Sequence, residues 1–353
     1  MESIYDIMKK ITPPDENARA AAKRRWDGLA KPLGGLGLFE DMVAKLAALK
    51  GDADVRLNDR RLLVFCADNG VVRQGVTQCG SHVTAKVAVA LAEGRSSVSP
   101  MAKLAGCRVI PVDVGILDFP GHPGVLNRRV RNGTDDLSLG PAMTGDECLT
   151  AMLYGAELAR ENAAAGADIL LIGEMGIGNT TSAAAVSCAL LGLDPDFLAG
   201  RGAGLSDAGM RRKRKVIRRA LDLNKPVPAD IVDVLTKVGG LDLAAMCGAC
   251  LGAAACNTPA VIDGVISAAA ALCALQLCPE SEKALFPSHV SGEKSGAAVL
   301  EGFDLKAPIR AEMRLGEGSG AVMLLPLLDM ALSLYCSGQS FDRLGIEAYT
   351  PQN

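Results

Sequence analysis

Aromatic residues are scarce in this chain of 353 residues. Phe, Trp and Tyr make up 3% of it, with a single Trp, whereas hydrophobic residues as a whole reach 49%. The core must therefore be built from Ala, Leu, Val and Ile, and the small Ala and Gly residues let helices and strands pack closely. Such a composition is typical of an α/β enzyme.

Excess charge and long apolar runs are also missing. The net charge is −3 and the pI about 5.8, so no basic field attracts nucleic acid or an anionic membrane surface. The N-terminus has no apolar signal segment, and Asp263, Pro326 and Asp329 interrupt the later apolar stretches before they reach membrane-spanning length. We expect a soluble, cytoplasmic protein that binds neither nucleic acid nor a membrane.

Metal-binding patterns are equally sparse. The three histidines are scattered, and most of the eleven cysteines lie in apolar patterns that favour reduced, buried thiols. Cys247 and Cys250 have the spacing of half a zinc or redox motif, but no second pair follows at the spacing of a metal site. The cysteines therefore predict no metal site.

Short runs rich in Val, Ile and Leu alternate with segments of helical spacing. The runs predict buried parallel strands at 61–67, 108–114, 168–173 and 259–266. The intervening segments predict helices at 147–165, 181–191, 209–223, 241–255 and 267–277. This alternation indicates an α/β fold, a doubly wound and mainly parallel Rossmann-like sheet.

The length of the chain favours one dominant domain with an appendage. We assign residues 51–330 to a large α/β catalytic domain. Residues 1–50 have helical patterns and precede the first strand, so we expect them to pack with the C-terminal helical residues, about 330–353, as a small helical domain.

Polar and glycine-rich loops follow the predicted strands. They comprise residues 67–71, 113–115, 174–179 and 263–264. In parallel sheets of this kind the ligand lies outside the carboxyl ends of the strands, so we expect the four loops to converge on one crevice.

The segment Gly173 to Thr181 leaves a strand and opens an Ala-rich helix. Free N–H groups and the helix dipole at such a turn favour a phosphate. The spacing fits neither the dinucleotide-binding fingerprint nor the P-loop. The alternative is a plain strand-to-helix turn in which Asn179 or Thr180 caps the helix, and the sequence leaves both open.

Two further segments carry polar groups. The glycine-rich run 200–207 leads into five consecutive cations at 211–215, most of which must be solvated, with about one left to close over a phosphate. The run 287–293 supplies hydroxyls and one imidazole. A Ser-His-acid triad is disfavoured there because no nucleophile elbow is present, and we expect these side chains to contact a ligand instead.

Glu317 lies between two glycines, just before a long apolar helix over 321–335. Flanking glycines let a ligand approach the carboxylate closely while the helix fixes its direction, as a general base requires. The alternative is an acid that stabilises the N-terminus of that helix. Sequence chemistry alone divides the two interpretations equally.

Taken together, these segments resemble the nicotinate-nucleotide:dimethylbenzimidazole phosphoribosyltransferase family, which activates the lower ligand of cobamides. The resemblance covers nearly the whole chain. The matching stretches are KPLGGLGLFE from Lys31, ADNGV from Ala67, GEMGIGNTTSAAA from Gly173, GRGAGLSDAGM from Gly200 with Lys213 after it, GGLDLAAMCGACLGAAA from Gly239, DGVISAAA from Asp263, SHVSGEKSG from Ser288 and RLGEGSGAVMLLPLLD from Arg314.

The resemblance implies transfer of a 5-phosphoribosyl group from nicotinate mononucleotide to a benzimidazole nitrogen, without metal or cofactor, by a homodimer. It places the catalytic base on Glu317 and a second carboxylate on Glu174. The implied phosphoribosyl contacts are Gly176, Ile177, Gly178, Asn179, Thr180, Lys213, Ser291 and Gly316, and those to the aromatic base are Gln78, Ser81 and Leu315.

The chain departs from the family pattern near the expected base pocket. Asn69 stands where a histidine is common, and Cys79 and Gly80 lie in a segment that lacks the usual Tyr-Pro. The acceptor is therefore open among benzimidazoles, purines and phenols.

Two other functions remain open at the level of sequence. One is a nucleotide hydrolase or nucleosidase in which Glu317 activates water. The other is a non-catalytic partner of an active homologue, which the joint presence of Glu317, Glu174 and Lys213 disfavours.

Overall fold

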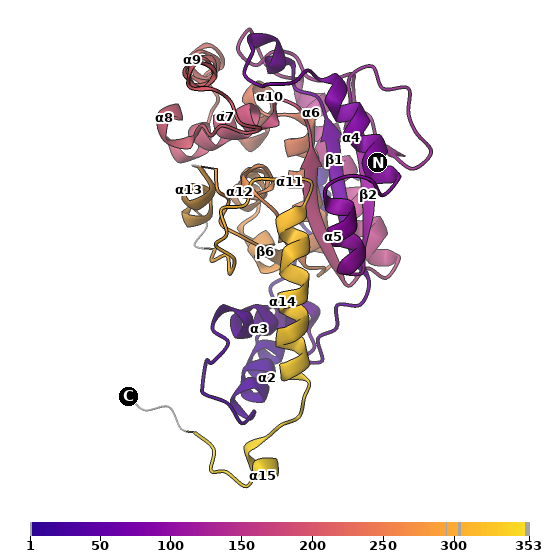
Figure 1. Cartoon of the computed structure of the whole chain (residues 1–353), viewed down its shortest axis with the longest axis vertical. Helices are drawn as coiled ribbons and strands as arrows, with labels where there is room; N and C mark the ends of the chain where they lie inside the picture. The colour runs from indigo at the N-terminus through magenta and orange to yellow at the C-terminus, as the bar shows by residue number, and fades with distance from the viewer. Residues whose placement is uncertain (1, 294, 303–304, 350–353) are drawn as a thin grey trace.

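The computed structural model describes residues 2–293, 295–302 and 305–349. Its centre is a sheet in which neighbouring described strands are parallel, in the order β3-β2-β1-β4-β5-β6 (Figure 1). The strands are β1 (Arg60–Ala67), β2 (Cys107–Gly115), β3 (Leu126–Asn127), β4 (Ile169–Met175), β5 (Ala260–Ile262) and β6 (Leu285–Pro287). The predicted α/β fold class is confirmed.

Helices connect the strands and flank the sheet. They are α1 (Ile4–Met8), α2 (Glu16–Asp27), α3 (Leu38–Lys50), α4 (His82–Ala92), α5 (Val98–Leu104), α6 (Gly145–Ala164), α7 (Asn179–Leu191), α8 (Pro195–Leu198), α9 (Asp207–Asn224), α10 (Ile231–Val238), α11 (Leu241–Ala255), α12 (Val265–Leu277), α13 (Ser295–Glu301), α14 (Ser319–Tyr335) and α15 (Phe341–Leu344), with 3₁₀ turns η1 (Gly70–Gln74) and η2 (Pro279–Ala284).

The two faces of the sheet build separate hydrophobic cores, because successive side chains of a strand point to opposite faces. Leu63 and Phe65 of β1 pack with α6, α7, α11 and α12. Leu62 and Val64 face the other way, toward α3, α4, α5 and α14. Helices therefore cover both faces, as a doubly wound sheet requires.

The fourth predicted strand is too long. β5 ends at Ile262, and α12 begins at Val265, inside the range predicted as strand. Periodicity cannot separate a buried strand from a buried helix within one apolar run. The short strands β3 and β6 offer too little pattern to be predicted.

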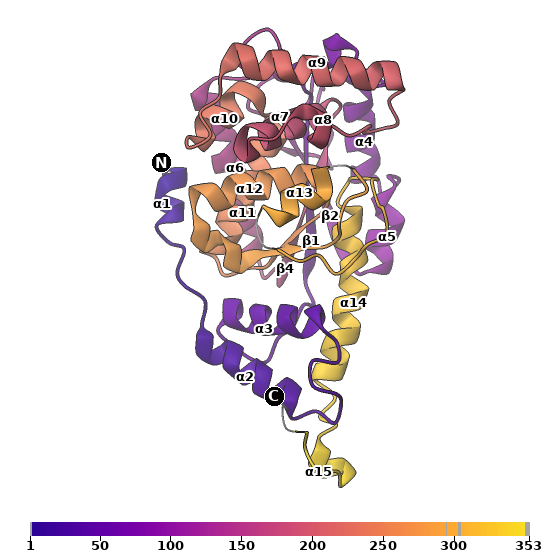
Figure 2. The ribbon, with the colours of Figure 1, turned by 90° about the vertical axis from the view of Figure 1, so that its left-hand side faces the viewer.

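Segments from the two halves of the chain lie side by side along α14, which runs from the sheet toward α2 and α3 (Figures 1 and 2). The rings of Trp26 and Tyr335 lie 5.0 Å apart, and Nε of Arg25 donates to the carbonyl of Tyr335 at 3.1 Å. α1 instead packs with α6 and α11 on the other face of the sheet. The division into two domains stays a proposal, and residues 350–353 lie outside the described residues.

Candidate active site

A cleft of about 290 Å³ opens at the carboxyl edge of the sheet, beside the ends of β4 and β5. The chain winds outward from β1 through β2 and β3, and then returns to lay β4 on the other side of β1. Such a switch of direction is where parallel sheets bind ligands. The remaining walls come from residues 76–78, from residues 201–203 and from the segment before α14.

Two of the four predicted loops line this cleft, those after β4 and β5. The loop after β1 lies behind the β4 turn, where the N–H of Asn69 donates to the carbonyl of Ile177 at 3.3 Å. The loop after β2 turns away from the cleft, and its Asp113 is paired with Arg129 at 2.7 Å. The expected convergence of all four is therefore wrong, because β2 lies one strand away from the switch point.

The turn after β4 carries five of the predicted phosphoribosyl contacts, and all five line the cleft. A Cβ on Gly176 would lie 2.4 Å from the carbonyl oxygen of Ala67, and Gly178 has a φ of 96°, so the close turn depends on both glycines. Gly178 is the N-cap of α7, so the alternative in which Asn179 or Thr180 caps this helix is wrong.

Asn179 instead bridges two buried carboxyl groups. Its Nδ2 donates to Oε2 of Glu174 and, at 3.1 Å, to Oδ2 of Asp242. Burial raises the pKa of Glu174 to about 8; the bond from Asn179 opposes this, while the charges of Asp242, Asp263 and Glu317 add to it. Burial also raises the pKa of Asp242 to about 6. Glu174 therefore holds a proton at neutral pH.

Glu317 lines the cleft from a strained backbone. Its φ is 59°, between Gly316 at 85° and Gly318 at 81°, a left-handed run that non-glycine residues rarely enter. Oε2 of Glu317 accepts from the N–H of Val98, the first residue of α5, at 2.9 Å. The carboxylate thus caps α5 rather than its own helix α14, whose N-cap is Gly318.

Asp263 holds the N-terminus of α14. Its carboxylate accepts from the N–H groups of Gly318 at 3.2 Å, Gly320 at 2.6 Å and Ala321 at 3.1 Å, which fixes the segment that carries Glu317. Burial raises the pKa of Asp263, while nearby His289 lowers it. The sequence predicted that Asp263 lies in a loop, but not that it binds the N-terminus of α14.

Lys213 is fully buried on α9 and does not line the cleft. Its Nζ donates to Oγ1 of Thr180 at 2.8 Å and to the carbonyl of Gly200 at 3.0 Å. Burial lowers the pKa of Lys213 to about 8, and the charge of Glu293 partly offsets this. Lys213 thus stands behind Thr180, and its contact with a phosphate stays a prediction.

The other predicted contacts divide in a similar way. Ser291, Gly316, Gln78 and Leu315 line the cleft, whereas Ser81 does not. Ser81 lies instead near the buried Asp68 carboxylate, where its hydroxyl opposes the rise in the pKa of Asp68 that burial causes.

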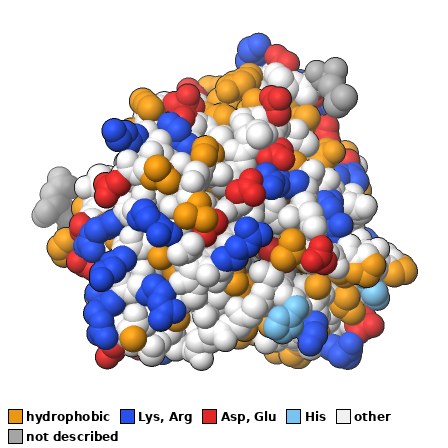
Figure 3. Space-filling model, turned by 90° about the horizontal axis from the view of Figure 1, so that it is seen from above, with side chains coloured by type: hydrophobic (Ala, Val, Ile, Leu, Met, Phe, Trp, Pro, Cys, Tyr) orange, Lys and Arg blue, Asp and Glu red, His pale blue; other side chains and the backbone are white. Residues whose placement is uncertain are grey.

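Arginines at the mouth of the cleft were missed in the sequence. Arg201 and Arg314 line both the cleft and a neighbouring groove of about 1010 Å³, which Arg211 and Arg214 of α9 also border. Figure 3 views this end of the molecule from above, and Lys and Arg side chains gather along one side of it. Only their positions in the fold, not the local pattern, distinguish these arginines from solvated charges.

Within the residues that the structure describes, no group of three or more His, Cys, Asp or Glu side chains is arranged to hold a metal ion. In the same part of the chain, no helix combines the length and hydropathy needed to cross a membrane.

A sequence model of a phosphoribosyltransferase family matches residues 11–346 of the chain. The chain belongs to this family. Two similar relatives are the nicotinate-nucleotide–dimethylbenzimidazole phosphoribosyltransferases of Acetivibrio thermocellus, 39% identical over 99% of each chain, and of Ruminiclostridium cellulolyticum, 41% identical over 94% of each.

A solved structure is similar to this phosphoribosyltransferase over most of its length. The crystal structure of CobT from Thermus thermophilus has a TM-score of 0.89 and 38% sequence identity, covering 94% of this chain and all of that one. The family predicted from the sequence is therefore confirmed.

Proposed function

We propose that this phosphoribosyltransferase transfers the 5-phosphoribosyl group of nicotinate mononucleotide to 5,6-dimethylbenzimidazole or a related base. The products are α-ribazole 5′-phosphate and nicotinate. The names of its relatives support this reaction. The observation that carries the proposal is that a carboxylate fixed by a helix N-terminus, Glu317, faces the same cleft as the glycine turn after β4.

The turn after β4 suits the phosphoribosyl group. Residues Gly176 to Thr180 lead into α7, so the first turn of this helix and the positive end of its dipole lie at the cleft. Lys213 adds a cation directly behind Thr180, and Arg201 and Arg314 add positive charge at the mouth. Together these groups attract and orient an anionic nucleotide.

Glu317 acts as the general base. The pyridinium of nicotinate mononucleotide departs as a neutral ring and needs no acid. The attacking heterocycle becomes acidic as its free nitrogen bonds to the sugar, and its other N–H must lose a proton. Glu317 accepts that proton, a contribution of about 10²- to 10⁴-fold in rate.

Glu174 has a different role, because burial keeps it protonated at neutral pH. A neutral carboxyl group cannot serve as a base there, but it can donate a hydrogen bond. We propose that its O–H group donates this hydrogen bond to the ribose or to the carboxylate of the leaving nicotinate. This division of labour follows the general pattern in which two carboxyl groups with different environments take different roles.

Glu317→Gln tests the proposal. The amide cannot accept the proton, so we expect kcat to fall about 100-fold or more while the KM for nicotinate mononucleotide stays within about twofold. Glu312→Gln, an exposed glutamate five residues earlier and outside the cleft, is the matched control.

Mass spectrometry of the products completes the test. A ribazole phosphate supports transfer, whereas ribose 5-phosphate formed in the presence of the base supports a hydrolase instead. A Glu317→Gln variant with near-normal kcat would contradict the assigned base. Competition among benzimidazoles, adenine and phenols in the same assay identifies the acceptor.

We also propose that the protein is a homodimer, with α14 in the interface. Met323 and Met330 of this helix are 46% and 62% exposed, so an apolar face lacks a partner among the described residues. A cytoplasmic location stays a prediction.

A further inference from the structure

The peptide of Ile177, at the centre of the turn after β4, is held from both sides. Its carbonyl accepts from the N–H of Asn69 at 3.3 Å, and its N–H donates to Oγ1 of Thr84 at 3.1 Å. Ile177 also lines the cleft. The position of the turn therefore depends on two groups outside the cleft, the backbone of Asn69 and the side chain of Thr84.

Thr84 lies on α4 and is completely buried. Its hydroxyl donates to Oδ1 of Asp68 at 2.6 Å. A hydroxyl has one hydrogen and two lone pairs, so a hydrogen committed to Asp68 leaves a lone pair for the N–H of Ile177. Asp68 thus sets the direction of the bond that Thr84 makes to the turn.

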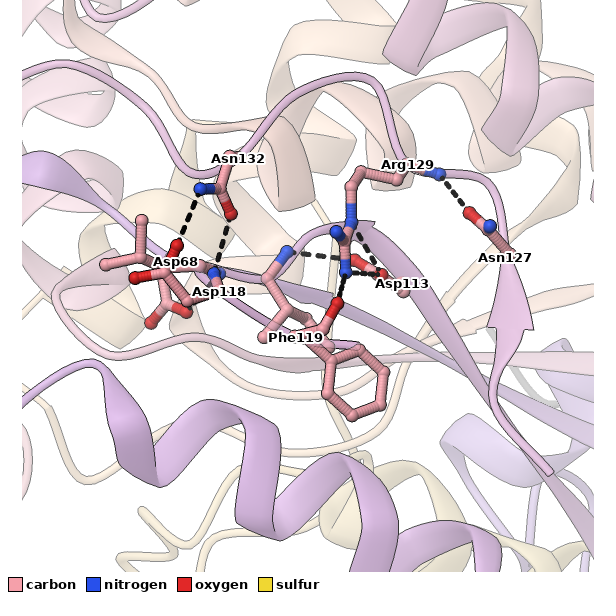
Figure 4. Close-up of polar contacts among 9 residues, drawn as sticks. Asp68, Asp113, Asp118, Phe119, Asn127, Arg129 and Asn132 are labelled. Atoms are coloured by element: carbon pink, nitrogen blue, oxygen red, sulfur yellow. Dashed lines mark hydrogen bonds and ion pairs between the residues drawn. The ribbon is translucent and has the colours of Figure 1, made fainter. Parts of the chain in front are cut away.

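A second segment of the chain fixes the carboxylate of Asp68. It is 2% exposed, and its Oδ2 accepts from the N–H of Leu117 at 2.9 Å. The segment of Leu117 is itself fixed, as Figure 4 shows: Arg129 donates to the carbonyl of Phe119, and the backbone N–H of Asp118 donates to Asn132. Asp68 therefore couples this segment to the turn.

We propose that Asp68 and Thr84 are positioning residues: Asp68 orients the Thr84 hydroxyl, and Thr84 holds the Ile177 peptide where the turn binds the phosphoribosyl group. The inference rests on the proposed function of that turn. Neither side chain touches the substrate, and neither is among the residues that line the cleft. They act on the nucleotide side of the site rather than on the aromatic base.

Thr84→Val tests the relay, because valine keeps the shape of threonine and removes the hydroxyl. The Ile177 N–H loses its partner, and we expect the KM for nicotinate mononucleotide to rise about tenfold. The KM of this variant for the aromatic base should change less than about twofold. Thr84→Ser keeps a hydroxyl, so its KM for nicotinate mononucleotide should lie within about threefold of the value for the natural chain.

Three comparisons make the outcome decisive. Thr236→Val removes a buried hydroxyl on α10, away from the cleft and the relay, and should leave both KM values unchanged. Thermal unfolding shows whether each variant is folded. If Thr84→Val does not fold, Asp68→Asn replaces it, since an amide cannot accept at both of its ends and should give the same nucleotide-specific rise.

An unchanged nucleotide KM in folded Thr84→Val, or equal rises for both substrates, would overturn the relay. Lys213→Ala separates this failure from failure of the proposed function. If Lys213→Ala raises the nucleotide KM and Thr84→Val does not, the relay alone is wrong. If neither variant raises it, the assignment of the turn to the phosphoribosyl group is wrong as well.

Discussion

Glu174 illustrates, at the scale of one residue, how a functional site opposes stability. Its pKa rises from 4.5 to about 8 on folding, mainly through burial. Between these two values the folded chain binds more protons at Glu174 than the unfolded chain does. The contribution of Glu174 to the free energy of unfolding therefore falls as pH rises through this window, and the loss is complete above pH 8.

Glu174→Gln should remove this pH-dependent loss, because the amide stays neutral and still accepts from Asn179. We expect the variant to have a higher free energy of unfolding than the natural chain at pH 8, and the difference to shrink toward zero near pH 5. Urea unfolding at both pH values measures it. The exposed Glu312→Gln serves as control; an equal difference at both pH values would rule out the linkage.

The site residues differ in how far sequence could place them. The turn from Glu174 to Thr180 follows from local rules, since a strand, a glycine turn and a helix are consecutive in the chain. Lys213 and Ser81 depend instead on how α9 and α4 pack, which no local pattern encodes. Asp242 was missed for the same reason: it opens a helix that appears wholly apolar, and only the packing of α11 brings it to Asn179.

At the scale of elements, α6 and α11 pack with their backbones in contact. A Cβ on Gly155 would lie 1.8 Å from the carbonyl oxygen of Ala245, and one on Gly248 would lie 1.8 Å from that of Met152. This contact fixes the position of α11, whose first turn carries Asp242. Glycine in these helices therefore serves the site as well as the core.

Gly248→Ala should destabilise the fold. Alanine gains about 1 kcal/mol in helix propensity, but overpacking against a backbone carbonyl costs about 1–3 kcal/mol or more. We expect a lower urea midpoint. Gly145→Ala, on α6 where a Cβ would meet nothing within 4 Å, should match or exceed the natural stability. A Gly248→Ala variant as stable as the natural chain would show that the two helices separate at little cost.

The elements themselves were largely predictable. The strands β1, β2 and β4 are long enough for their apolar runs to be recognised, and the helices between them keep a clear period. β5 was predicted only in part, and β3 and β6 not at all, because two or three residues of strand are defined by pairing with their neighbours rather than by composition. The doubly wound topology survives these errors, since helices still lie in the connections from β1 to β2, β3 to β4, β4 to β5 and β5 to β6.

At the scale of the whole molecule, α14 exposes an apolar stripe. It consists of Met323, Pro326, Leu327, Met330 and Leu334, which share one side of the helix by their spacing of three, one, three and four residues. Met330 and Leu334 also border a groove of about 390 Å³ beside Leu29 and Ala30, at the end of α2. A contiguous apolar face next to a groove indicates a protein contact, and a second copy of the chain is the partner we propose.

Met330→Glu should break the dimer, because it places a charge in the apolar contact and two-fold symmetry places it there twice. We expect light scattering after size exclusion to give a dimer mass for the natural chain and a monomer mass for the variant. Since Met330 is 62% exposed in one chain, unfolding of the isolated monomer should change little.

Leu139→Glu is the matched control, because Leu139 is 68% exposed in the segment before α6, away from α14, and this variant should remain dimeric. A natural chain that stays monomeric at high concentration, or a Met330→Glu variant with the natural dimer mass, would exclude this face as the interface.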